Sequence, residues 1–237
     1  MNPLSALIDL ILPRVCHVCE KKLVDGEEFI CRDCVARLPL TRYERYRFNR
    51  SAPNSDLNPM EQRFAGQLPL VHAGAPFFYT RDSALASLIH DFKYRGFSRL
   101  ASAMGRLGAR TLMESELFQG VDIMIPVPLH WSKRLSRGYN QSLFIAEGVS
   151  EATGIPVGTH LRAVRPHRTQ TSLSREQRAA NPRGIFRVAR PHELAGKHVM
   201  IIDDICTTGA TLLSAGEALA AATGHNIRLS FFTLGVV

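Results

Sequence analysis

The chain has 237 residues, a formal net charge of +8, a pI near 9.6, and a composition that is 45% hydrophobic and 21% charged. This balance excludes a largely disordered chain, and the length suffices for one large α/β domain with a small accessory module. The excess of Lys and Arg favours polyanionic partners such as phosphates or nucleic acid.

The first residues argue against export and against insertion into a membrane. An apolar stretch from Leu4 to Leu12 contains Asp9 and has no basic segment before it, unlike a secretory signal. No run in the sequence reaches the roughly 18 apolar residues that a membrane-spanning helix needs. We therefore expect a cytoplasmic protein, whose cysteines are thiols or metal ligands rather than disulfides.

Four of the five cysteines form two CxxC pairs, with eleven residues between the pairs: Cys16 and Cys19, then Cys31 and Cys34. This spacing is typical of a four-thiolate tetrahedral Zn²⁺ site, because each CxxC turn presents two sulfurs to one ion. The alternatives are a redox-active CxxC pair and reduced core thiols, although neither requires two such turns this close. His17 could replace a cysteine as a ligand, but four cysteines already satisfy the ion. We expect residues 1–40 to form a zinc-ribbon module with a structural Zn²⁺.

Residues 41–72 form a polar stretch with no sustained helical or strand period, and we interpret them as a linker or an irregular flap. Within it, residues 42–50 (RYERYRFNR) interleave arginine with tyrosine and phenylalanine. Such a segment could stack nucleobases on its rings and meet phosphates with its arginines. The alternative is a solvated linker whose aromatic rings cover the neighbouring domain. The sequence leaves both interpretations open.

Strand and helix patterns alternate through residues 73–237. The expected strands are Gly74–Thr80, Val121–Pro128, His198–Asp204 and Ile227–Gly235, and the expected helices are Ser83–Tyr94, Leu100–Met113, Gly138–Gly154 and Thr211–Thr223. This alternation predicts an α/β domain with a mostly parallel sheet flanked by helices on both faces. Ligands in such sheets bind beyond the carboxyl ends of the strands.

The most informative stretch is VMIIDDICTTGAT, residues 199–211. Four apolar residues predict a central strand, and Asp203 and Asp204 follow where it leaves the sheet. At least one of these carboxylates should face the crevice and meet vicinal hydroxyls or a Mg²⁺-bound sugar. The turn from Thr207 to Thr211 then opens directly into a helix, where backbone N–H groups and hydroxyls can bind a phosphate. The two halves together indicate a ligand with a diol and a phosphate.

Two other interpretations of this stretch are weaker. A Walker B strand also ends in two acidic residues, but it works with a GxxxxGK[ST] loop, and the sequence contains none. The carboxylates could simply cap the following helix, although one Asp would suffice for that.

The sequence as a whole resembles the ComF competence-protein family, whose domain is a type I phosphoribosyltransferase. The resemblance rests on residues 199–211 and on FKYRG (92–96), IPVPLH (125–130), KRLSRGYNQS (133–142) and RTQTSLSREQRAANPRGIF (168–186), in this order, together with the paired CxxC motifs. It implies binding of 5-phosphoribosyl-1-pyrophosphate (PRPP) with Mg²⁺, and a part in natural transformation. It also covers relatives named for gluconate uptake.

The resemblance also implies roles for individual residues. Asp203 and Asp204 would hold the ribose hydroxyls, and the 5′-phosphate would bind to Thr207, Thr208, Gly209, Ala210 and Thr211. The pyrophosphate loop would contain Pro128, Leu129 and His130. The segment 170–178 would be the flexible loop that closes over the reacting centre, where Arg178 is the expected catalytic residue beside the two aspartates.

Displacing pyrophosphate from PRPP needs cations around the leaving group and exclusion of water. Basic residues near the expected strand ends and in the expected lid are candidates for this role, namely Lys93, Arg95, Lys133, Arg134, Arg137, Arg168, Arg175 and Arg178. No element that would recognise an acceptor is visible, so binding PRPP and transferring its sugar are separate hypotheses. The alternative function is a non-catalytic protein that binds single-stranded DNA and a partner helicase on the same fold.

Overall fold

The computed structural model describes residues 13–45, 57–129, 137–164 and 184–237. Its strands are β1 (Leu70–Gly74), β2 (Phe77–Phe78), β3 (Ile123–Pro126), β4 (Leu161–Ala163), β5 (Phe186–Val188), β6 (His198–Cys206) and β7 (Arg228–Val236). Its α-helices are α2 (Arg32–Ala36), α3 (Pro59–Gln62), α4 (Ala84–Tyr94), α5 (Ser98–Thr111), α7 (Gln141–Thr153) and α9 (Ala210–Ala222). Short 3₁₀ helices are η1 (Tyr43–Arg45), η2 (Glu116–Phe118) and η4 (Pro191–Glu193).

The main sheet has five strands and is parallel throughout, which confirms the expected fold class. Its order is β1-β7-β6-β3, and β2 continues along the same edge of β7 as β1, with Phe77 opposite Gly235. β6 and β7 occupy the centre, and residues 198–202 and 229–236 are buried. Near-continuous apolar strands of this kind form where helices cover both faces of a parallel sheet.

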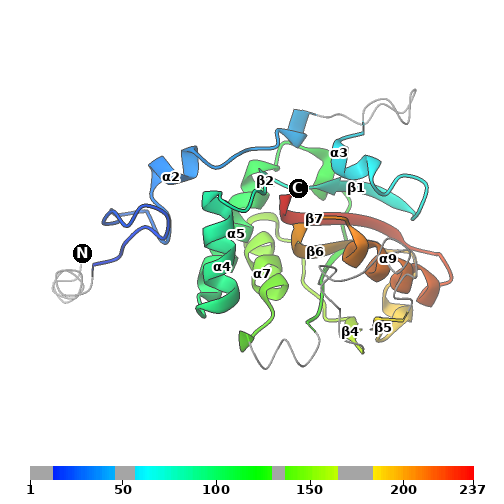
Figure 1. The fold of residues 1–237 in the computed structure, drawn as a ribbon. Helices are drawn as coiled ribbons and strands as arrows, with labels where there is room; N and C mark the ends of the chain where they lie inside the picture. Colours follow the sequence, from blue (N-terminus) through cyan, green and yellow to red (C-terminus); the bar gives the residue numbers. More distant parts are fainter. Residues whose placement is uncertain (1–12, 46–56, 130–136, 165–183) are drawn as a thin grey trace, which may run out of the picture.

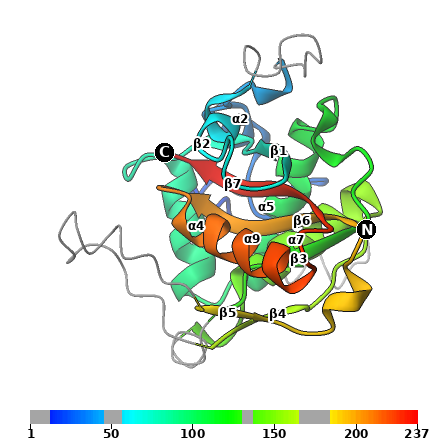
Figure 2. The ribbon, with the colours of Figure 1, turned by 90° about the vertical axis from the view of Figure 1, so that its right-hand side faces the viewer.

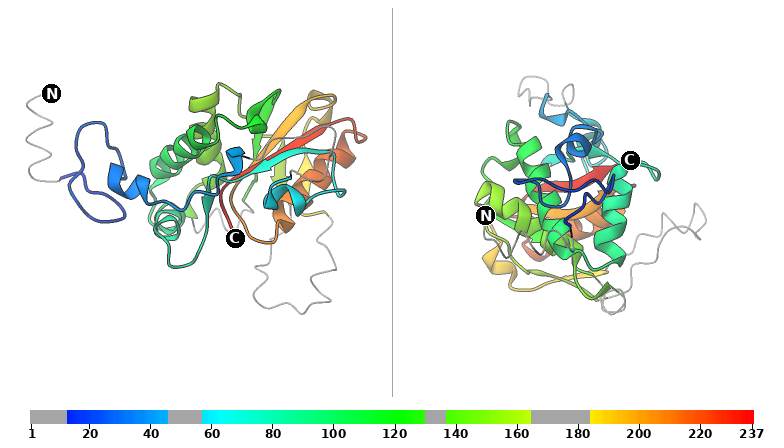
Figure 3. Two further views of the ribbon diagram at one scale, coloured as in Figure 1. Left: turned by 90° about the horizontal axis from the view of Figure 1, so that it is seen from above. Right: turned by 90° about the vertical axis from the view of Figure 1, so that its left-hand side faces the viewer.

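Two helical layers cover the sheet. Helices α4, α5 and α7 lie on one face, and α9 lies on the other (Figure 1). The antiparallel pair β4 and β5 lies apart from the main sheet, beyond its β3 edge (Figure 2). The cysteine-rich residues 13–37 project from the side of α4 and α5 (Figure 3). No helix in the described part of the chain has the length and apolar content needed to cross a membrane.

Helices α5 and α7 approach each other closely at two glycines. A Cβ atom on Gly105 would lie 2.2 Å from the carbonyl oxygen of Ile145, and one on Gly148 would lie 1.9 Å from that of Ser102. Only glycine permits these distances, since any side chain would displace the facing backbone. The two helices therefore form one interlocked layer on the sheet, in which α7 packs on β3 and β6 and α5 packs on β7.

The structure corrects the first predicted strand. We expected Gly74–Thr80, but the chain forms β1 at Leu70–Gly74 and only a two-residue β2 at Phe77–Phe78. Pro76 lies between the two strands and has no N–H to donate to a ladder. The strand that pairs with the start of β7 therefore comes from residues that looked like the end of a linker.

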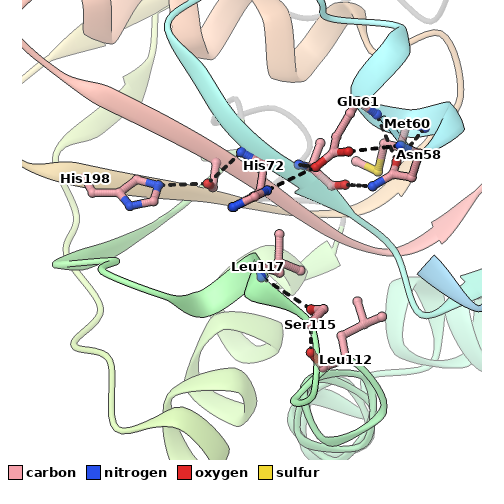
Figure 4. A network of polar contacts seen from close by, with 10 residues as sticks. Asn58, Met60, Glu61, His72, Leu112, Ser115, Leu117 and His198 are labelled. Atoms are coloured by element: carbon pink, nitrogen blue, oxygen red, sulfur yellow. Dashed lines mark hydrogen bonds and ion pairs between the residues drawn. The ribbon is translucent and has the colours of Figure 1, made fainter. Parts of the chain in front are cut away.

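Residues 57–69, within the stretch expected to be a linker or flap, carry α3 and pack on the main body. Asn58 and Glu61 form a capping box, in which each side chain accepts a hydrogen bond from the backbone N–H of the other residue. The Glu61 carboxylate also contacts His72 and the N–H of Ala73 in β1 (Figure 4). Met60 and Phe64 are buried in the main core. The division of the chain into domains stays a prediction.

Candidate functional site

A cavity of about 380 Å³ opens at the carboxyl ends of β3 and β6, which is within the usual size range for a small-molecule site. Its lining comes from the last turn of α4, the loop after β3, the end of β6, the loop into α9, and the β4–β5 pair. Among the lining residues are Lys93, Pro128, Leu129, Arg137, Phe186, Asp203, Asp204, Thr207, Thr208, Gly209, Ala210 and Thr211. The residues predicted to bind PRPP at the end of β6, in the loop into α9 and in the loop after β3 therefore line one cavity, as far as the structure describes them.

The two aspartates at the end of β6 have different partners. Asp203 Oδ1 accepts hydrogen bonds from Ser142 Oγ at 3.0 Å and from the Asp204 N–H at 2.9 Å. Asp204 Oδ2 pairs with Lys93 Nζ at 2.6 Å. Burial, reinforced by the neighbouring Asp204 charge, raises the pKa of Asp203 from 3.8 to about 7. The site therefore holds one ion-paired carboxylate beside one that titrates near neutral pH.

The raised pKa predicts that Asp203→Asn stabilises the ligand-free protein above neutral pH. The asparagine Oδ1 can keep both hydrogen bonds that Asp203 accepts. As pH rises from about 4 to about 7, the unfolded chain loses the Asp203 proton and the folded chain keeps it. The wild-type free energy of unfolding then falls relative to the variant, by at most about 1.4 kcal/mol per pH unit.

Urea unfolding at pH 5 and pH 8 checks this prediction, and the advantage of Asp203→Asn should be larger at pH 8. Glu147→Gln, which changes an exposed carboxylate on α7, should leave the pH dependence as in wild type. An advantage of equal size at both pH values would contradict the assigned cause.

The loop from Cys206 to Ala210 turns the chain from β6 into α9. Gly209 is the N-cap residue of α9 with φ 80°, so no side chain at that position caps the helix. Thr207 and Thr208 are exposed, and Thr208 Oγ1 accepts a hydrogen bond from the Ala210 N–H at 3.4 Å. A helix N-terminus and hydroxyls that face a cavity can together bind an anion.

Gly209 is also confined by the Phe64 ring, so a side chain at position 209 should lower the stability of the folded protein. A Cβ atom would lie 2.6 Å from Cζ of the buried Phe64 ring. Gly154, the C-cap residue of α7, has a similar φ of 75° and no atom within 4 Å of such a Cβ. We expect Gly154→Ala to lose about 1 kcal/mol for the left-handed backbone, and Gly209→Ala to lose clearly more. Equal losses in urea unfolding would show that Phe64 does not confine the loop.

Arg63 also holds the loop by hydrogen bonds. Its guanidinium donates hydrogen bonds to the backbone carbonyl oxygens of Thr207 and Val237. Together with the contact of Phe64 beneath Gly209, this places residues 63 and 64 directly against the loop. The sequence did not reveal this role, although the Asn58-Pro59 start of α3 with Glu61 three residues later was a legible helix signal.

The cavity lining also includes a cation and an aromatic ring, Arg137 and Tyr94. The Arg137 guanidinium lies 5.2 Å from the centroid of the Tyr94 ring, and Arg137 Nη2 is 3.4 Å from the Tyr94 hydroxyl. The Tyr94 side chain is 62% exposed. From the α7 side, Asn140 Nδ2 donates to the Val127 carbonyl oxygen at 3.0 Å and so fixes the loop after β3.

Several expected site residues lie outside the described residues. These are His130 of the expected pyrophosphate loop, Lys133 and Arg134, and the expected lid with Arg168, Arg175 and Arg178. The roles of these residues stay predictions. The same holds for the ligand-binding roles of the residues that line the cavity. Of the other basic candidates, Lys93 and Arg137 line the cavity, and Arg95 pairs with Asp91.

The four N-terminal cysteines come together as predicted. The sulfur atoms of Cys16, Cys19, Cys31 and Cys34 all lie within 4.8 Å of one another, and the Cys19 and Cys31 sulfurs are 3.6 Å apart. A tetrahedral Zn²⁺ with bonds of about 2.3 Å requires sulfur separations of about 3.8 Å, so this donor set fits the ion. The N–H groups of residues 18 and 31 donate to the Cys16 sulfur, each at 3.4 Å. His17 instead contacts Asp91 and is not part of the cluster.

Comparison with known proteins agrees with this geometry. A family model described as phosphoribosyl transferase domain matches residues 140–232. The DNA utilization protein YhgH of Salmonella typhi is 31% identical over 140 residues, which cover 57% of this chain and 60% of that protein. Competence protein F of Haemophilus influenzae is 29% identical over 57% of this chain and 61% of its own length. Competence protein ComFC of Bacillus subtilis is 26% identical over 66% of this chain and 61% of its own length.

The chain thus spans about three fifths of the length of the curated relatives that it matches. The matched region contains the end of β6, the loop into α9 and the β4–β5 pair, which form much of the cavity wall. The chain therefore has a phosphoribosyltransferase domain and an N-terminal four-cysteine cluster, and it is similar in sequence to the YhgH and ComF proteins named above.

Proposed function

We propose that the chain binds PRPP together with Mg²⁺ in the cavity between β3, β6 and α9, and transfers its phosphoribosyl group to an acceptor during the use or uptake of DNA. The observation that carries this proposal is the position of two carboxylates and a helix N-terminus on one cavity wall. A pentose phosphate presents a diol and a phosphate at complementary positions. The relatives are DNA utilization and competence proteins, which supplies the biological context.

In this proposal, polar groups of the cavity bind separate parts of PRPP. Asp203 and Asp204 accept hydrogen bonds from the ribose hydroxyls, and Thr207 to Thr211 bind the 5′-phosphate. Lys93 neutralises Asp204 at 2.6 Å while the diol is absent. Carboxylates and hydroxyls are oxygen donors of the kind that Mg²⁺ accepts, so the residues fit a Mg²⁺-bound sugar phosphate. When bound, Mg²⁺ would offset the charge of the leaving diphosphate.

The described residues also offer cations for the diphosphate. Lys93 and Arg137 line the cavity near Pro128 and Leu129, where we place the pyrophosphate. Their charges would stabilise the negative charge that develops as pyrophosphate leaves C1 of the sugar. The catalytic role of Arg178 is part of the same proposal, as is the role of His130 in the pyrophosphate loop.

Calorimetric titration of the full chain with PRPP and Mg²⁺ tests the binding step. We expect PRPP to bind at least about tenfold more tightly than pyrophosphate or ribose 5-phosphate, because only PRPP engages the aspartates, the loop and the cations together. Equal affinity for PRPP and pyrophosphate would contradict the assigned site. Catalysis is tested separately by pyrophosphate release in the presence of nucleobases, nucleosides or single-stranded DNA.

A second candidate is a non-catalytic protein that binds single-stranded DNA and a helicase partner. The formal net charge of +8 favours it, and so does the similarity to DNA utilization and competence proteins. Its affinity for an oligonucleotide should fall steeply as salt rises, because phosphate contacts release counterions. An affinity for DNA that is indifferent to salt would count against this candidate.

A further inference from the structure

The C-terminal turn of α4 is held from three directions. On the cavity side, Lys93 Nζ pairs with Asp204 at 2.6 Å. From the loop before α7, the Tyr139 hydroxyl donates a hydrogen bond to the carbonyl oxygen of Phe92. On the far side, Asp91 faces the four-cysteine module. The position of Lys93 in the cavity therefore depends on contacts that lie outside the cavity.

The contact between α4 and the four-cysteine module passes through His17, inside the first CxxC turn. His17 Nδ1 lies 2.9 Å from Asp91 Oδ2, and the two side chains are only 17% and 7% exposed. The His17 ring packs edge-on against Phe97 with centroids 4.6 Å apart. Its backbone N–H donates to the Phe29 carbonyl oxygen at 3.0 Å. Packing on both sides thus fixes His17 in the interface.

Asp91 needs this partner because its carboxylate is buried. Oδ1 contacts Arg95 Nη1 at 3.3 Å, but the Arg95 side chain is 65% exposed and is free to move into solvent. Without His17, Oδ2 would lose its buried donor, and a buried carboxylate without donors is strongly unfavourable. The last turn of α4 would shift to let Asp91 reach water. Lys93 and Tyr94 belong to the same turn, so they would shift with it.

We propose that His17 is a positioning residue for the cavity, through which the docked four-cysteine module sets the place of Lys93 opposite Asp204. The proposal rests on the proposed function, because its readout is the affinity for PRPP with Mg²⁺. It gives the module a role in the phosphoribosyl site in addition to its own folding. His17 acts here through hydrogen bonding and packing and does not touch the ligand.

Calorimetric titration of full-length variants with PRPP and Mg²⁺ tests this proposal. We expect His17→Ala to keep its zinc and to remain folded with a lower melting temperature, and to bind PRPP about tenfold more weakly, a usual size for coupling between two sites. His17→Asn should recover most of the affinity, because its Nδ2 takes the place of Nδ1 as donor to Asp91. The double variant His17→Ala with Asp91→Ala, which leaves no buried carboxylate to displace the turn, should recover most of the affinity.

A double-mutant cycle separates positioning from a general structural effect. In a Lys93→Met background, His17→Ala should change the affinity by less than about twofold, since the residue through which it acts is gone. Independent, multiplying losses in this cycle would overturn the proposal, and so would a double variant His17→Ala with Asp91→Ala that binds PRPP as weakly as His17→Ala. Failure of the wild-type chain to bind PRPP would overturn the proposed function first. Binding by the wild type with equal affinity in His17→Ala would overturn this inference alone.

Discussion

The chain with Asp203→Asn and Asp204→Asn is expected to bind PRPP with Mg²⁺ at least about a hundredfold more weakly than wild type and to release no pyrophosphate. Hydrogen bonds to a charged acceptor contribute about 1.5–3 kcal/mol each, and both carboxylates are removed. Calorimetry and a pyrophosphate-release assay measure the two effects. The double variant should remain folded, because Asp203 is destabilising when charged and asparagine preserves its two hydrogen bonds.

Glu147→Gln is the matched control for this experiment, since it converts a carboxylate to an amide on the exposed side of α7. It should bind PRPP as tightly as wild type. Turnover retained by the double aspartate variant would rule out the assigned site. An equal loss in Glu147→Gln would point to a general electrostatic effect of the lost charge.

Replacing Cys31 with serine is expected to release the metal and to unfold residues 13–37. Cys31 is buried in a small cluster with Cys16, Leu23 and Cys34, which is too small to hold a fold without a metal. In modules of this kind the ion supplies on the order of 10 kcal/mol of folding free energy. Metal analysis should find about one zinc per wild-type chain and none in the variant, and hydrogen exchange should show the loss of protection in the module.

Cys206→Ser is the control for the loss of a thiol, because Cys206 lies at the end of β6 and outside the cluster. It should retain a full complement of zinc. A wild-type chain without metal whose module is still protected from exchange would end the zinc hypothesis. If the inference about His17 holds, Cys31→Ser should also weaken PRPP binding, since the module would no longer dock on Asp91.

Local sequence patterns were sufficient to predict the centre of the fold and much of the site. The apolar run before Asp203 predicted β6 because only a buried parallel strand is apolar on both faces. The paired CxxC turns predicted the sulfur cluster because each turn fixes its own geometry. The helices α4, α7 and α9 lie within a few residues of their expected ranges, and the side chains of Ser83 and Asn140 cap the first two.

The features that could not be predicted from the sequence depend on contacts between segments that are distant along the chain. A four-residue helix such as α3 has no period to detect, so the packing of Phe64 beneath Gly209 was not visible. The pairing of Lys93 with Asp204 and the contact of His17 with Asp91 join residues from separate elements. The raised pKa of Asp203 follows from its burial in the folded protein. No local pattern encodes such relations.

The close packing of α5 against α7 at Gly105 and Gly148 makes the α7 side of the site rigid. Helix α7, with Ser142 at its start, cannot slide or rotate against α5 without backbone collision. On the other side, Gly209 rests on the Phe64 ring just after the single turn of α3, and this contact is made by a side chain rather than by two packed helix backbones. Amide protons of α7 should therefore exchange with solvent far more slowly than those of residues 60–66, where adaptation to a ligand should begin.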